Sequence, residues 1–239
     1  MRPSVPRRAR NDLRQYDDLA DQWWDPQGAF CSLHWLAEAR GRLIPPAPAS
    51  GGQLLDVGCG GGLLAPHVHG YHHVGVDLSP TALAVAAEHG VEGVEADVAA
   101  LPFADSSFDV VVAGEILEHV TDLPGTVADA LRVLKPGGAF ICDTINSTRL
   151  ARLVLVTIGE HVRGGPPPAC HDPELFVNPR ELQRLCAAGN VQLSVHGLRP
   201  ASLQFLAFQL HRRQSVDMVR SRSLAAVYQG FGTKALVTS

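Results

Sequence analysis

The stretch that decides the fold is Leu54-Leu55-Asp56-Val57-Gly58-Cys59-Gly60-Gly61-Gly62-Leu63, in which a short apolar strand runs into a cluster of glycines. Glycine adopts φ > 0 and carries no Cβ, so four glycines in five positions are typical of a loop that lies against a bound molecule. A second strand, Val74-Gly75-Val76, ends at Asp77, whose carboxylate can accept hydrogen bonds from a ribose diol. This layout predicts a cofactor site.

Two features of the loop bear on which cofactor it binds. The dinucleotide fingerprint G-x-G-x-x-G/A needs a small third residue, but Gly58-x-Gly60-x-x is followed by the bulky Leu63. Asp56 stands just before the glycines, where a carboxylate would repel a pyrophosphate but could bind an ammonium and a sulfonium, directly or through water. S-adenosylmethionine carries both groups, so the loop favours this cofactor over a dinucleotide.

Apolar strands alternate with helical segments along most of the chain, which predicts an α/β fold with a mostly parallel sheet. A serine cap before a proline at Ser79-Pro80 marks a helix start, and Lys135-Pro136-Gly137-Gly138 ends the next long helix. We expect an aromatic-rich helical cap between Tyr16 and Arg40. The expected strands are 53–58, 73–78, 91–97, 108–114, 138–143, 190–197 and 224–231, and the expected helices are 62–69, 80–89, 122–134 and 178–188.

Length and composition bound the class of protein. A chain of 239 residues that is 46% hydrophobic and 18% charged suffices for one large α/β domain. The net charge of −4 argues against a nucleic-acid partner. Five cysteines without a C-x-x-C pair indicate neither a disulfide framework nor a cysteine zinc site. No apolar run approaches the 18 or so residues of a membrane helix, so we expect a cytoplasmic protein. We interpret the basic start as a solvated tail, with Arg2, Arg7, Arg8, Arg10 and Arg14.

Ligands of open α/β sheets bind at the carboxyl ends of the strands, which singles out the residues that follow each strand. In order and spacing, the motifs there resemble those of the class I S-adenosylmethionine-dependent methyltransferases over residues 50–145. The motifs are Asp56-x-Gly58-x-Gly60-Gly61-Gly62, Asp77, Glu95-Ala96-Asp97, Phe108-Asp109-Val110-Val111 and Leu134-Lys135-Pro136-Gly137-Gly138. The resemblance implies a Rossmann-like, mostly parallel seven-stranded sheet with helices on both faces and an N-terminal helical cap.

The same resemblance implies the positions that bind the cofactor. Asp77, followed by Leu78, would hold the ribose hydroxyls, Asp97 with Val98 would hold the adenine, and the Gly58 loop with Asp56, Gly60 and Gly114 would hold the methionine part. Asp97 could instead cap the turn that follows it.

The segment Gly114-Glu115-Ile116-Leu117-Glu118-His119 places two carboxylates and an imidazole on one face if the chain is helical there. His119 could act as a general base on a hydroxyl, because imidazole titrates near neutrality. Alternatively, Glu115, Glu118 and His119 could hold a divalent ion, with His171 as a further ligand, and lower the pKa of a bound phenol. Methyltransferases that act on RNA ends use a similar Glu-x-x-Glu-His and a distant His around magnesium. A packing role for His119 is the third interpretation.

A closer resemblance to one family extends from the start of the chain to its end. The segment Ala20 to Phe30, Leu33-His34 and Arg40 resembles the leading part of the ubiquinone-biosynthesis O-methyltransferases, and Asp143-Thr144-Ile145-Asn146, His171-Asp172 and Tyr228-Gln229-Gly230-Phe231 extend the match. This family methylates a phenolic oxygen of a polyprenylated catechol. It implies that Arg40 pairs with the methionine carboxylate, the alternative being a surface arginine. The apolar run 150–156 would be a lid for a lipid tail or for membrane contact, or else a core helix.

The sequence departs from the family at two places. Glu38-Ala39 replaces the usual Asn-Pro before the arginine, and Gly165-Pro166-Pro167-Pro168-Ala169-Cys170-His171-Asp172 replaces a Lys-Gly-Thr-His-Asp loop at the rim of the acceptor pocket. We therefore predict a helical cap and tail over 1–50, and a methyltransferase domain over 51–239 with a lid around 146–178.

The functional prediction is S-adenosylmethionine-dependent O-methylation of a small phenol or catechol, with or without a prenyl chain and with or without help from magnesium, manganese or zinc. The open alternatives are an N- or C-methyltransferase of a specialised metabolite and a binding or regulatory protein that retains the cofactor fold. We expect a small aromatic substrate, no nucleic acid and peripheral membrane contact.

Overall fold

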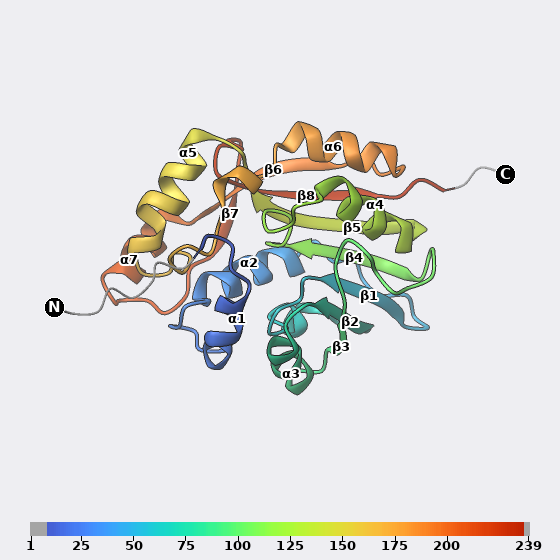
Figure 1. Ribbon diagram of the computed structural model, residues 1–239, viewed down its shortest axis with the longest axis horizontal. Coiled ribbons are helices and arrows are strands. Elements are labelled where there is room, and N and C mark those ends of the chain that lie inside the picture. Colours follow the sequence, from blue (N-terminus) through green and yellow to red (C-terminus); the bar gives the residue numbers. More distant parts are fainter. Residues whose placement is uncertain (1–8, 237–239) are drawn as a thin grey trace.

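One mixed sheet of eight strands organises the computed structural model, which describes residues 9–236 (Figure 1). Its order is β3-β2-β1-β4-β5-β8-β6-β7. The strands are β1 (Gly52–Val57), β2 (Tyr71–Asp77), β3 (Glu92–Glu95), β4 (Phe108–Gly114), β5 (Leu134–Ile145), β6 (Ser194–Pro200), β7 (Met218–Ser221) and β8 (Val227–Thr233). Strands β1 to β5 pair parallel with one another, whereas β8 pairs antiparallel with β5 and β6, and β7 pairs antiparallel with β6.

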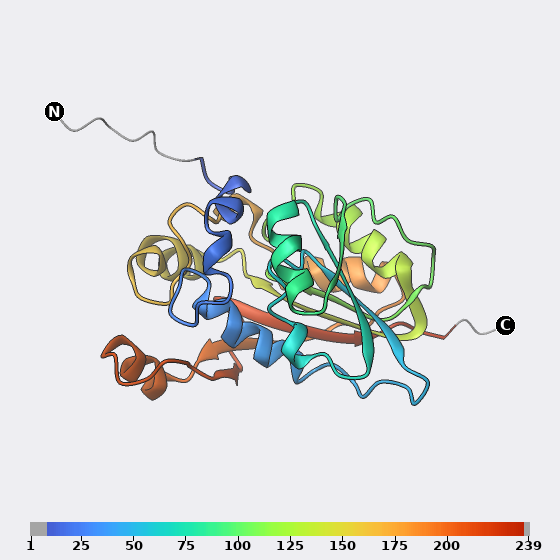
Figure 2. The same ribbon diagram turned by 90° about the horizontal axis from the view of Figure 1, so that it is seen from below.

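Helices cover both faces of this sheet. The α-helices are α1 (Arg14–Asp18), α2 (Cys31–Gly41), α3 (Pro80–Glu88), α4 (Leu123–Val133), α5 (Arg149–Ala151), α6 (Pro179–Ala188) and α7 (Ser202–Gln209). Helices α4 and α6 bury Leu131 and Leu182 against Val57 and Val111 on one face. On the other face, α2 leads into an apolar layer that packs on β1 and β4. Figure 2 shows α2 and α4 on opposite sides of the sheet.

Side-chain caps begin the three helices that the sequence locates best. Ser79 accepts a hydrogen bond from the Ala82 N–H before α3, Asp122 caps α4, and Asn178 caps α6. Each cap precedes a proline in the first turn, where the missing N–H has no intrahelical partner to lose. These helices confirm the predicted segments 80–89, 122–134 and 178–188 to within one residue at each end.

The predicted strand count of seven is one too low. Strand β7 is only four residues long and pairs with the second half of β6, so it has too few residues to show an alternating pattern. Strand β6 begins at Ser194 rather than at the predicted residue 190. Val191 lies before it and forms only an isolated bridge with Lys234.

Two predicted helical segments are wrong in extent. The segment 62–69 forms only a 3₁₀ turn, Ala65–His67, because Pro66 cannot donate the hydrogen bond that an α-helix needs there. The segment from Tyr16 to Arg40 is divided into α1, a 3₁₀ turn at Ala20–Gln22, and α2. The turn around Pro26 and Gly28 separates these pieces.

The prediction of a solvated basic start agrees with Arg10 and Arg14, which are both exposed, while Arg2, Arg7 and Arg8 lie outside the described residues. Arg10 donates from Nη1 to Glu160 Oε1 at 2.7 Å and to the carbonyl of His171 at 3.0 Å. Arg14 pairs with Asp12. Figures 1 and 2 both place α1 between α5 and α3.

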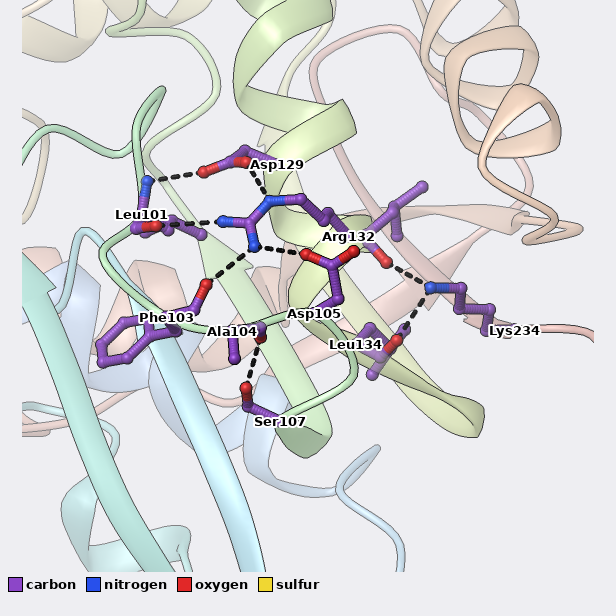
Figure 3. Close-up of polar contacts among 10 residues, drawn as sticks. Leu101, Phe103, Ala104, Asp105, Ser107, Asp129, Arg132, Leu134 and Lys234 are labelled. Atoms are coloured by element: carbon purple, nitrogen blue, oxygen red, sulfur yellow. Dashed lines mark hydrogen bonds and ion pairs between the residues drawn. The ribbon is translucent and has the colours of Figure 1, made fainter.

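A polar cluster fixes the loop that joins β3 to β4 and carries Asp97 (Figure 3). Arg132 of α4 donates to Asp129, to Asp105 and to the carbonyls of Leu101 and Phe103. Asp129 also accepts from the Leu101 N–H. Nearby, Lys234 binds the carbonyls of Leu131 and Leu134 at the end of α4. One arginine thus satisfies several loop carbonyls and holds the loop against the sheet.

Candidate active site

A cavity of about 1170 Å³ opens at the carboxyl ends of the parallel strands. Every residue predicted to bind the cofactor lines it, namely Arg40, Asp56, Gly58, Gly60, Asp77, Leu78, Asp97, Val98 and Gly114. Glu115, His119 and His171 line it as well. Glu118 is not among the lining residues and lies fully buried behind them. The cavity is large enough for a nucleoside-sized cofactor together with an acceptor.

The glycine loop needs its glycines for conformation and for space. Gly58 and Gly60 have φ of +71° and +50°, the left-handed region that other residues rarely adopt. A Cβ on Gly58 would lie 2.5 Å from Ile116, and one on Gly60 would lie 2.5 Å from the Trp23 ring. The loop is thus packed tightly between β1 and the N-terminal aromatic segment.

Asp77 stands at the end of β2 and faces the loop. Its two oxygens accept hydrogen bonds from the N–H groups of Gly60, at 2.9 Å, and Ser79, at 3.0 Å. Burial raises the pKa of its carboxyl, although these hydrogen bonds act in the opposite direction. A carboxylate held in this way keeps lone pairs for a diol. Leu78 beside it is 50% exposed, which leaves an apolar surface open in the cavity wall.

Asp97 caps the turn that follows it, which confirms one of the two interpretations of the sequence. Its Oδ1 accepts from the Ala99 N–H at 2.9 Å. The residue also lines the cavity, so the two interpretations are compatible.

Arg40 is buried and pairs with Asp143, so the alternative of a surface arginine is wrong. Its Nε and Nη2 donate to the two carboxylate oxygens at 2.8 and 2.9 Å. The guanidinium lies against Gly114, where a Cβ would stand 1.9 Å from Cζ. Gly114 is therefore required as the neighbour of a buried arginine. The sequence motif around Asp143 did not reveal this partnership.

The chain after β4 bends sharply at Glu115, which has φ of +53°, a strained value for a residue with a Cβ. This bend turns Glu118 and His119 back toward the sheet. Glu118 Oε2 accepts from Thr144 Oγ1 at 2.7 Å. Glu115 Oε1 and Glu118 Oε1 are buried and have no hydrogen-bond partner.

Glu118, His119 and His171 form a group whose candidate ligand atoms all lie within 4.8 Å of one another. The two imidazoles stack with centroids 5.1 Å apart. Of the four predicted metal ligands the structure thus gathers three, and Glu115 is not part of this group, although it interacts with Glu118. His171 comes from the remodelled loop, more than 50 residues beyond the Glu-His motif.

Burial controls the charge of these groups. It lowers the pKa of His119 to about 4 and that of His171 to about 3, the latter with help from His119 and Arg10. It raises the pKa of Glu118 to about 7 and that of Glu115 well above its usual range. The imidazoles are therefore neutral at pH 7, the form in which they bind metals.

Two residues that the sequence did not indicate contact His119. The hydroxyl of Tyr16 lies 3.3 Å from His119 Nε2, and the side chain of Asn11 lies 2.6 Å from Nδ1. Both come from the N-terminal segment, more than 100 residues away along the chain. No local pattern in this segment could have indicated these contacts.

Known proteins are similar to this chain in fold and in sequence. A family model described as a methyltransferase domain matches residues 55–142. A solved S-adenosylmethionine-dependent methyltransferase from Thermotoga maritima superposes with a TM-score of 0.66 at 19% identity, covering 92% of this chain and 97% of that one. The fold is that of this S-adenosylmethionine-dependent methyltransferase, and the matched domain is a methyltransferase domain.

Similarity to curated proteins is more specific. The ubiquinone biosynthesis O-methyltransferase of Idiomarina loihiensis is 36% identical over 199 residues, which covers 78% of this chain and 82% of the relative. The enzyme of that name from Ralstonia nicotianae is 38% identical over 207 residues, which covers 82% and 84%. The chain belongs to the ubiquinone biosynthesis O-methyltransferase family.

We expect Asp77→Ala to weaken S-adenosylmethionine binding, because it removes a charge-assisted hydrogen bond to the ribose. The loss should be about 1.5–3 kcal/mol, roughly 10- to 150-fold in Kd, by isothermal titration calorimetry. Glu92→Ala is the matched control, since this carboxylate lies exposed at the start of β3. An affinity unchanged in Asp77→Ala would remove Asp77 from the ribose role.

Proposed function

We propose that the protein transfers a methyl group from S-adenosylmethionine to a phenolic hydroxyl of a catechol that carries a prenyl tail. The observation that supports this most is the Glu118, His119 and His171 group, two members of which line the cavity beside the glycine loop. Neutral imidazoles next to a carboxylate suit a divalent cation, which would help a phenolic oxygen to lose the proton that it must lose before it can attack.

The residues present fit the cofactor. Asp77 would bind the ribose, and the apolar Leu78 and Val98 would contact the adenine. Arg40 uses Nε and Nη2 for Asp143, which leaves Nη1 for the carboxylate of the methionine part. S-adenosylmethionine supplies an electrophilic methyl: the acceptor oxygen bonds its carbon as the carbon–sulfur bond breaks, with the electron pair left on sulfur.

The residues also fit a divalent cation, held by Glu118, His119 and His171. Glu118 Oε1 is buried without a partner, which is costly unless a cation or a proton satisfies it. An imidazole with a pKa of about 4 would hold a phenolic proton poorly, so His119 suits a ligand better than a metal-free base. A bound cation would lower the pKa of a phenol from about 10.

Glu115 is the group that we assign to the phenolic proton. It lines the cavity, its Oε1 is unpartnered, and its pKa is raised well above the usual range by burial and by Glu118. A carboxylate with a raised pKa is a competent base near neutrality. The Glu115 carboxylate would thus accept the proton as the phenolic oxygen is aligned with the methyl group.

The lid supports the prenyl part of the proposal. It begins with α5 and continues as a π-helix, Arg152–Ile158. This segment buries Ala151 and Val156 while exposing apolar side chains, and α7 also exposes apolar side chains. The exposed side chains are Leu150, Leu153, Val154 and Ile158 in the lid and Leu203, Leu206 and Leu210 in and after α7. No helix among the described residues is long and apolar enough to cross a membrane. This apolar rim suits a lipid tail or the surface of a bilayer.

The test is methyl transfer to matched catechols with and without a prenyl chain, before and after EDTA treatment. We expect activity that is lost on chelation and restored by one of magnesium, manganese or zinc, and a lower KM for the prenylated acceptor. Activity that is indifferent to chelation would refute the metal. Transfer only to nitrogen or carbon acceptors would refute the phenolic substrate, and equal KM values would refute the tail site.

A further inference from the structure

Asn11, in the N-terminal segment, contacts the site at His119. The Asn11 side chain makes two hydrogen bonds to one residue: Nδ2 donates to the His119 carbonyl at 2.9 Å, and Oδ1 lies 2.6 Å from His119 Nδ1. The Asn11 N–H also donates to the carbonyl of Ala169, in the loop that carries His171. Asn11 thus joins both halves of the Glu-His-His group.

These contacts determine which nitrogen of His119 carries the proton. A carbonyl oxygen only accepts, so the Asn11 atom that faces the His119 carbonyl must be the amide nitrogen. The other terminal atom is then the oxygen, which can only accept. His119 Nδ1 must therefore be the donor, and its Nε2 carries the lone pair.

The lone pair of Nε2 faces the hydroxyl of Tyr16. The hydroxyl of Tyr16 lies 3.3 Å from Nε2 and can donate to it. Burial raises the pKa of Tyr16 well above its usual value, which keeps it a donor. His171 is arranged in a similar way, with Nδ1 3.3 Å from Cys170 Sγ. Both imidazoles therefore engage Nδ1, and a ligand or proton at His119 Nε2 would replace the long Tyr16 contact.

We propose that Asn11 is a positioning residue that fixes His119 in the Nδ1–H tautomer, so that Nε2 is held ready as ligand or proton acceptor. The proposal rests on the proposed function for its catalytic meaning, but the tautomer itself does not depend on the acceptor. Partners that orient a ligand imidazole commonly change metal affinity or activity by about 10- to 100-fold when they are removed.

The backbone conformation at Asn11 supports this assignment and determines which substitution is the best test. Its φ is +57°, a left-handed conformation that asparagine tolerates and glycine adopts freely. Asn11→Gly therefore removes the carboxamide without adding backbone strain and retains the N–H that binds Ala169. Asn11→Asp keeps an acceptor for Nδ1 but loses the donor to the His119 carbonyl.

The experiment is long-range ¹H–¹⁵N correlation of imidazole-labelled full-length protein at neutral pH, with His119 assigned by its substitution. We expect the Nδ1–H pattern in the wild type, a shift toward Nε2–H in Asn11→Gly, and the Nδ1–H pattern again in Asn11→Asp. In parallel, kcat should fall about 10- to 100-fold in Asn11→Gly, with S-adenosylmethionine affinity unchanged.

Gln15→Ala is the matched control. Gln15 lies buried in the same segment and ties it to the same loop through the carbonyl of Pro168, but it does not touch His119. An unchanged His119 tautomer in Asn11→Gly would overturn the proposal, and so would an equal shift in Gln15→Ala. If no catechol is methylated, the proposed acceptor fails, while the tautomer shift still decides the role of Asn11.

Discussion

His119→Ala should reduce methyl transfer about 10²- to 10⁴-fold while leaving S-adenosylmethionine bound with nearly wild-type affinity. The reason is the position of His119, which lines the cavity and belongs to the Glu118 and His171 group. Its loss would remove the proposed cation ligand or proton acceptor and would leave Asp77, Asp97 and the glycine loop in place. The measurement is kcat with labelled cofactor, next to calorimetric cofactor affinity.

His196→Ala controls for the loss of an imidazole in the same sheet. His196 lies on β6, is partly buried and does not line the cavity. This variant should keep wild-type kcat. Wild-type turnover in His119→Ala would exclude His119 from both the ligand and the base role, and would return it to the packing interpretation.

Local signals in the sequence were enough to predict one half of the site. The glycine loop, Asp77 and Asp97 each follow a strand, and in a parallel sheet the carboxyl ends of strands meet at one edge. Helix caps at Ser79, Asp122 and Asn178 likewise depend on neighbours a few residues away. Because these features are short-range, a single sequence carries them.

The other half depends on contacts between distant segments. Asn11 and Tyr16 reach His119 across more than 100 positions, and Arg40 reaches Asp143 across 103. No periodicity encodes which distant partner a polar side chain meets. The same limit explains β7, since a four-residue strand exists only because β6 offers it an edge.

The buried ion pair between α2 and β5 should have the largest effect on stability. We expect Asp143→Asn to lower the free energy of unfolding by about 3–5 kcal/mol, because it leaves the Arg40 guanidinium charged and unpaired inside the protein. The side chains of Arg40 and Asp143 are 7% and 0% exposed, so water cannot replace the lost carboxylate. Urea unfolding of both proteins at pH 7 measures the difference.

Two further variants distinguish the cost of losing an ion pair from the cost of leaving a buried charge unpaired. Glu38→Gln removes the partner of Arg42, an exposed pair next to Arg40 along the chain, and should cost no more than about 0.5 kcal/mol. The double variant Arg40→Met/Asp143→Leu removes both charges together and should recover most of the stability lost in Asp143→Asn. A loss below about 1 kcal/mol in Asp143→Asn would mean that the guanidinium finds another partner there. Since Nη1 of Arg40 is outside the pair, a double variant that folds well yet binds S-adenosylmethionine weakly would assign that nitrogen to the cofactor.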